Sequence, residues 1–134
     1  MNKAKITELY KKYELTADDV FKHKHYLIIT RSGIEKIMAL GKIEVGYEVI
    51  RCEPDFVVIK AFNGKLETFG SAKHGGKIQN DKGKWVEVGN TTSWYVTEVA
   101  EKRAMARLVL KQVGFYQLGV FSEDESEDFK RPKQ

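Results

Sequence analysis

Residues 97–114, TEVAEKRAMARLVLKQVG, say more about the fold than any other stretch of this chain. We interpret this stretch as one long helix. Gly114 follows the last apolar residue, where glycine commonly ends a helix. Small residues that would let another layer approach closely lie among the larger ones: Ala100, Ala104 and Ala106. We therefore expect a packed helix over residues 93–113, begun by Thr92 or Ser93, to organise the domain.

The same helix carries a regular series of positive charges. Arg103, Arg107 and Lys111 recur every four residues, which places them in one column along a helix. One interpretation is an ordinary solvated basic face. The other is a cationic stripe that holds the phosphate backbone of a nucleic acid.

Residues upstream of this helix predict an antiparallel meander of three strands. Apolar side chains alternate with acids over 43–49, as in a half-buried strand. Further strands are predicted over 56–62 and 66–72, after a turn at 53–55. Asn63-Gly64 favours a type I′ hairpin turn, which requires positive φ at both central positions.

The N-terminal third predicts three short helices and a strand. Helical spacing covers residues 3–13, and Thr16 precedes a short helix over 17–21 that begins with two acids. Residues 26–29 form an apolar run typical of a buried strand. Ser32 then begins a helix that ends at Gly41. The fold class is α+β: an antiparallel meander sheet of three to five strands, N-terminal helices, and a long C-terminal helix packed on one face.

Length and charge predict one basic domain and a tail. The 134 residues carry a net charge of +4, but 123–128 contain five acids and no base. We expect a single domain over 1–121 and a disordered charged tail over 122–134. The lone cysteine, Cys52, excludes an internal disulfide. Neither a signal peptide nor a membrane-spanning run is visible, so we expect a cytoplasmic protein.

A polar, glycine-rich excursion over residues 73–85 combines positive charge with an aromatic ring. Cations that follow a backbone and rings that stack on bases together bind single-stranded nucleic acid. An ordinary solvated hairpin whose tryptophan belongs to the core is the alternative. The residues of interest are Lys73, Lys77, Lys82, Lys84 and Trp85.

The sequence offers no catalytic or metal centre. His23 and His25 lack the further ligands that a metal site needs, since His74 is distant in sequence. Gly75-Gly76-Lys77 does not fit the spacing of a phosphate-binding loop. The serines are not set in a nucleophile elbow. We therefore predict a protein that is not an enzyme and needs no cofactor or metal.

Several stretches, among them residues 18–28 and 67–70, resemble phage-type single-strand annealing proteins, an Erf-like group related in fold to the eukaryotic annealing mediator of recombination; two more carry most of the resemblance. The first is the helix of residues 98–107, with Ala100, Ala104 and Arg107 at comparable positions and a closing glycine; the second is 119–125. The resemblance implies a β-β-β-α core, homo-oligomeric rings or filaments, binding of single-stranded DNA in a basic groove, and no nucleotide hydrolysis.

The predicted function is therefore a non-enzymatic single-stranded DNA-binding protein that assists strand annealing or recombination in a phage or mobile element. The predicted DNA contacts are Arg103, Arg107, Lys111, Lys73, Lys77, Lys82, Lys84 and Trp85. The alternative is an interaction module that recruits a replication or nuclease partner through its sheet and acidic tail. The tail residues predicted to bind that partner are Glu123, Asp124, Glu125, Glu127, Asp128 and Phe129.

Overall fold

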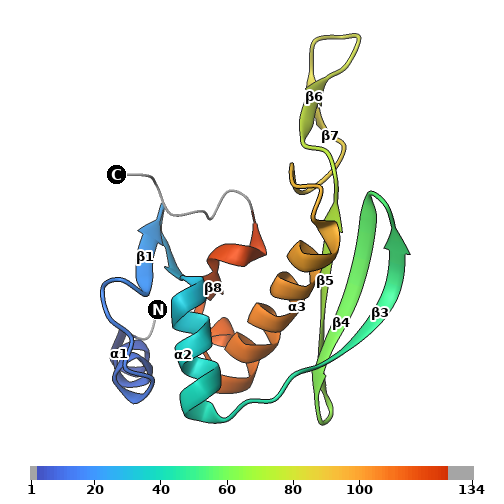
Figure 1. Cartoon of the computed structure of the whole chain (residues 1–134). Coiled ribbons are helices and arrows are strands. Elements are labelled where there is room, and N and C mark those ends of the chain that lie inside the picture. The colour runs from blue at the N-terminus through green and yellow to red at the C-terminus, as the bar shows by residue number, and fades with distance from the viewer. Residues whose placement is uncertain (1–2, 127–134) are drawn as a thin grey trace.

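The computed structural model describes residues 3–126 and confirms the α+β class (Figure 1). The long C-terminal helix α3 lies on one face of an antiparallel meander, as expected. The elements, in chain order, are α1 (Lys3–Lys12), β1 (Val20–His23), β2 (Tyr26–Ile29), α2 (Arg31–Gly41), β3 (Gly46–Glu53), β4 (Phe56–Asn63), β5 (Leu66–Lys73), β6 (Lys77–Gln79), β7 (Trp85–Glu87), α3 (Val96–Val113), the 3-10 turn η1 (Tyr116–Leu118), β8 (Val120–Ser122) and the 3-10 turn η2 (Glu123–Glu125).

Helix α3 lies between two hydrophobic cores. One side packs on β4 and β5 through Ala100, Ala104 and Leu108, and the other packs on α1, α2 and β8 through Val109 and Leu110. A helix with apolar partners on both sides has apolar residues around most of its circumference. This explains why its sequence shows no single apolar face.

The alanines of α3 do permit a close approach. A Cβ added at Gly70 of β5 would clash with the backbone nitrogen of Ala104. The Thr68 hydroxyl also donates a hydrogen bond of 2.7 Å to the Ala104 carbonyl. Helix and sheet therefore meet through backbone and small side chains at this point.

The meander is confirmed, with the strand order β3-β4-β5 and antiparallel pairing throughout. The turn between β4 and β5 lies one residue later than predicted. Asn63 pairs with Leu66, so the two central residues are Gly64 and Lys65, and of these only Gly64 has a positive φ, of 62°. That sign pattern matches a type II′ turn and not type I′.

Strand β3 is less buried than its alternation predicted. It begins at Gly46, and all its later residues are exposed. Helix α3 covers β4 and β5 but does not extend over β3 (Figure 1). The apolar members of this strand consequently face solvent.

The prediction of a short helix over residues 17–21 is wrong. A turn there leads into β1, which forms a second sheet with β2 and β8. The buried Asp19 accepts hydrogen bonds from the Thr16 amide, the Ser32 hydroxyl and, at 2.6 Å, Lys36 Nζ. Burial raises the pKa of the Asp19 carboxyl, but the bond from Lys36 and those from Thr16 and Ser32 outweigh this and lower the pKa to about 2.

Two predicted helix starts also differ. Tyr95 precedes α3 without a side-chain cap, so the helix begins at Val96 and not near residue 93. Thr30, not Ser32, caps α2 by accepting a hydrogen bond from the Gly33 amide.

The predicted tail boundary at residue 122 lies too early. Ser122 is fully buried in β8, and residues 123–125 form η2 against α3. β8 pairs in parallel with β2, which gives the segment a place in the smaller sheet. Three residues of the predicted partner-binding tail, Glu127, Asp128 and Phe129, lie outside the described residues.

Candidate functional site

Arg103 is an internal clamp and not part of an exposed stripe. Its side chain is 5% exposed. The guanidinium donates one hydrogen bond of 3.0 Å to each of three carbonyl oxygens, those of Ser71, Asn90 and Asp124. These acceptors lie on β5, on the loop before α3 and on η2. Arg103 therefore fits neither the solvated basic face nor the phosphate-holding stripe, because the fold uses all three of its nitrogens.

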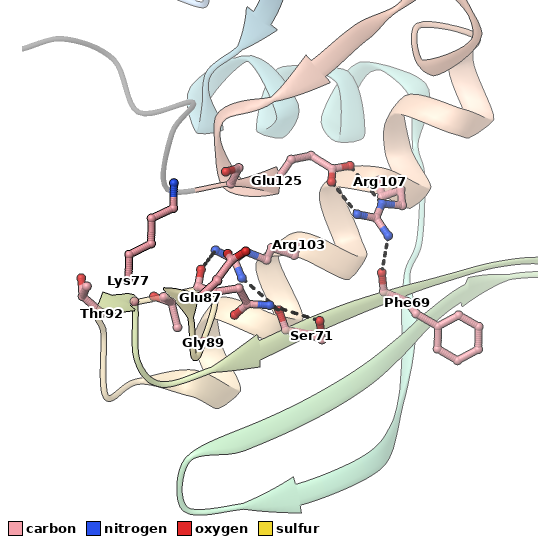
Figure 2. A pocket seen from close by; sticks show the side chains of 13 residues that line it. Phe69, Ser71, Lys77, Glu87, Gly89, Thr92, Arg103, Arg107 and Glu125 are labelled. Carbon is pink, nitrogen blue, oxygen red and sulfur yellow. Dashed lines mark hydrogen bonds and ion pairs between the residues drawn. The ribbon is translucent and has the colours of Figure 1, made fainter. Parts of the chain in front are cut away.

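Arg107 is occupied in a similar way (Figure 2). Its guanidinium forms a two-point ion pair with Glu125, at 3.0 and 2.5 Å, and a hydrogen bond of 2.9 Å to the Phe69 carbonyl. The hydrogen bonding of Arg107 to the Glu125 carboxylate raises the pKa of Arg107 above its usual value. The predicted phosphate contact is thus already matched by a carboxylate of the same chain.

Lys111 does not join these two arginines in one groove. Its amine lies 5.2 Å from the centre of the Tyr116 ring, beside the turn that follows α3. The three residues share a helical column, as predicted, but each serves a different local structure.

Of the cationic residues predicted to contact DNA, Lys77, Lys82 and Lys84 are exposed on the β6–β7 hairpin. This hairpin projects beyond the rest of the domain at the N-terminal end of α3 (Figure 1). The side chain of Asn80 shapes its tip by accepting hydrogen bonds from the amides of Lys82 and Lys84. Trp85 is 66% exposed, so the alternative of a core tryptophan is excluded.

One face of the hairpin continues into a cavity. Cross-strand register pairs Lys77 with Glu87 and Gln79 with Trp85, and alternation places all four on the same face. Lys77 and Glu87 also line a cavity of about 520 Å³ between the hairpin base, β5, α3 and η2. Figure 2 shows Arg103 and Arg107 lining it below Glu125. The tryptophan and the cavity are thus parts of one surface.

Lys73 lies apart from this surface. Its amine is 5.8 Å from the centre of the Phe56 ring, on the face of the sheet that α3 does not cover. Its backbone amide donates to Asn90 Oδ1, at 2.8 Å. The structure therefore separates Lys73 from the hairpin residues with which it was grouped.

Two exposed aromatic side chains at the base of the hairpin were missed. Trp94 and Tyr95 are 66% and 73% exposed. The Trp94 ring stacks on His74, with centroids 3.4 Å apart and planes 19° apart, and His74 Nδ1 lies 3.1 Å from the Ser93 carbonyl. The adjacent Trp-Tyr pair before a helix was the available signal.

Two acids that follow β8, Glu123 and Glu125, hold parts of the fold together through their carboxylates. Glu123 accepts a hydrogen bond of 2.9 Å from the Arg31 amide at the start of α2, and Glu125 holds Arg107. Both acids were predicted to contact a partner. Among residues 3–126, no group of three or more histidine, cysteine or acidic side chains is arranged to hold a metal ion. In the same range, no helix is both long and apolar enough to cross a membrane.

Comparison with known proteins does not identify a family: no family model, curated protein or solved structure matches this chain.

Proposed function

We propose that the protein binds single-stranded DNA through the β6–β7 hairpin and assists strand annealing or recombination, without making or breaking a covalent bond. The observation that carries the proposal is the exposed Trp85 on a projecting hairpin that also bears Lys77, Lys82 and Lys84. An aromatic ring left in solvent offers a stacking surface to an unpaired base. Lysines on the same arm supply attraction to the backbone phosphates.

Charge around the hairpin favours a polyanionic ligand. Residues 77–88 contain three lysines against two carboxylates, Asp81 and Glu87, while residues 1–121 together carry a net charge of +6. Attraction of this kind does not depend on base sequence. It leaves base edges exposed for pairing, which annealing requires.

The cavity extends the proposed path beyond the hairpin. A strand stacked on Trp85 would pass Lys77 at the mouth of this cavity. Since Glu125 occupies Arg107, the lysines form the first contacts and the arginines serve the structure below them. The proposed interface is therefore Lys77, Lys82, Lys84 and Trp85.

Fluorescence anisotropy with a labelled oligothymidylate at two salt concentrations tests the proposal. We expect affinity to fall as salt rises, because each neutralised phosphate releases counterions. Trp85→Ala should weaken binding by roughly 5- to 150-fold, because one stacked base contributes about 1–3 kcal/mol to the binding free energy. Lys82→Ala/Lys84→Ala should weaken binding and reduce the salt dependence.

A matched control removes the same charge elsewhere. Lys11→Ala/Lys65→Ala takes away two exposed lysines, one on α1 and one in the β4–β5 turn, at the end of the sheet away from the hairpin (Figure 1). This variant should bind like the unmodified protein. Equal losses in both double variants would indicate attraction to total charge and would refute a hairpin interface.

The second candidate function is an interaction module that recruits a replication or nuclease partner. The face of the sheet opposite α3 is uncovered and exposes Phe62 and Phe69 at 37% and 48%. Absence of oligonucleotide binding at low salt would favour this function. Binding that is lost in the hairpin variants and kept in Phe69→Ser would favour the first.

A further inference from the structure

The two edge strands of the β3-β4-β5 sheet differ in whether their outer backbone groups are hydrogen-bonded. On β5, backbone groups alternate between β4 and the outer edge, and the outward carbonyls of Phe69 and Ser71 accept hydrogen bonds from Arg107 and Arg103. The Lys73 carbonyl accepts from the Asn90 amide. These bonds close the β5 edge to another strand.

The β3 edge is open. β3 pairs with β4 alone, and the register directs the outer backbone groups of Tyr47, Val49 and Cys52 away from the sheet. Within residues 3–126, no hydrogen bond reaches those groups. Apolar side chains lie along the same edge, with Tyr47, Val49 and Ile50 exposed at 41%, 58% and 50%. An open apolar edge is a template for another strand.

We propose that two copies of this chain join through their β3 strands, antiparallel, about a two-fold axis between Val49 and Ile50. The six strands of the two meanders then form one sheet. Pairing of this isologous kind closes on itself and gives a dimer. The proposal does not depend on nucleic-acid binding.

Charge supports this register. Glu48 lies opposite Arg51 of the second copy, and the two-fold axis repeats the pair. In this register β3 also pairs with β3 of the second copy along its whole length, from Gly46 to Glu53. A shift of two residues would instead set Glu48 against Glu53, where like charges repel.

An ion-pair ladder on the same face lacks one positive charge. Lys60 of β4 contacts both Glu48, at 2.9 Å, and Glu67, at 3.4 Å. One lysine thus serves two carboxylates. Arg51, which contacts Glu53 of its own chain at 2.9 Å, would extend the ladder when it lies opposite Glu48 of the second copy.

The bulge in β3 supports the same axis. An extra residue lies between the pairs Val49–Ile59 and Arg51–Val58. Before the bulge, the odd-numbered residues Tyr47 and Val49 direct their backbone N–H and C=O groups away from β4. After the bulge, the even-numbered Cys52 does so. Tyr47 and Cys52 can then face each other across an axis between Val49 and Ile50, with both backbones directed outward. The phase of the backbone and the charge pattern therefore select one register.

Charge exchange tests the interface. Light scattering over a concentration series should show a dimer for the unmodified protein. Glu48→Lys should raise the dimer dissociation constant by about tenfold or more, since it places like charges opposite each other twice. Glu48→Lys/Arg51→Glu should restore dimerisation, because the exchanged charges attract again. Glu67→Lys, which removes the other carboxylate of Lys60 on the far strand, should leave dimerisation unchanged.

Cysteine cross-linking tests the register. In Tyr47→Cys, the new thiol lies opposite Cys52 of the second copy, so oxidation should give a covalent dimer. The two thiols of one chain are separated by roughly 17 Å of extended strand and cannot join to each other. Tyr47→Cys/Cys52→Ser should give no such dimer. A monomer at every concentration, or dimers indifferent to the charge variants, would overturn the proposal.

Discussion

The positive side chains of α3 and those of the β6–β7 hairpin are alike in charge and differ in role. Arg103 and Arg107 point into the domain and bond carbonyls and a carboxylate, whereas Lys82, Lys84 and the neighbouring Trp85 lie on an arm in solvent. The difference arises from what surrounds each group. Beside α3, unpaired carbonyls at the edge of β5 need donors, and the planar guanidinium supplies several. At the hairpin tip no such need exists, and the charge stays available to a ligand.

Arg103→Ala gives the strongest test of the internal role. We expect the free energy of unfolding to fall by about 3–5 kcal/mol, because three carbonyls lose their charged donor and a buried space opens. Urea denaturation measures this loss. Arg103→Lys should recover little of it, since one amine cannot reach three acceptors on separate segments. A loss within about 0.5 kcal/mol, as for an ordinary surface residue, would contradict the clamp.

Asp19→Asn tests the other buried charge network. The carboxyl has a pKa of about 2 in the folded state against 3.8 for the ordinary group. A lowered pKa contributes stability that is present above pH 3.8 and lost as the pH falls toward 2. The substitution should therefore cost about 2 kcal/mol at neutral pH and flatten the pH dependence of stability between pH 4 and 2. The exposed Asp55→Asn is the control and should change neither quantity.

Arg107→Ala should lower the free energy of unfolding by about 1–2 kcal/mol. This loss is smaller than that expected for Arg103→Ala because Arg107 is partly exposed to solvent. Glu125→Gln should act in the same direction. A double-mutant cycle on unfolding free energies measures their coupling, which we expect to be about 1 kcal/mol. Strictly additive losses would show that the ion pair does not tie η2 to α3.

Lys82→Ala/Lys84→Ala should leave the unfolding free energy within about 0.5 kcal/mol. Their amides, not their amines, take part in the hydrogen bonds of the hairpin tip. A large destabilisation would mean that these charges serve the fold as the arginines do, and the contrast between the two regions would disappear.

Local patterns predicted the elements better than the roles of their residues. The strands over 56–62 and 66–72, the close alanine packing and the glycine end of α3 follow from alternation, side-chain size and backbone freedom, all of which act between near neighbours. The short helix at 17–21 failed because Asp19 serves tertiary contacts with α2. The boundary at 122 failed because Ser122 is buried in a parallel pairing with β2, far away in sequence.

The candidate site was predicted in part, for a similar reason. Composition predicted the role of the hairpin, because lysines around an aromatic residue lie close together in the sequence and involve no distant segment. It misassigned Arg103 and Arg107, because helical spacing fixes their column but not the carbonyls of Phe69, Ser71 and Asn90 that meet it. Trp94 was missed, since its stack on His74 joins segments separated by a whole hairpin.

A titration of the isotope-labelled protein with oligothymidylate, followed by NMR, tests the division between the two regions most directly. We predict that the amide signals of residues 77–88 and the Trp85 indole signal shift as ligand is added. The side-chain Nε–H signals of Arg103 and Arg107 should keep their positions and their protection from solvent exchange. Shifts that begin at the two arginines and spare the hairpin would contradict the account.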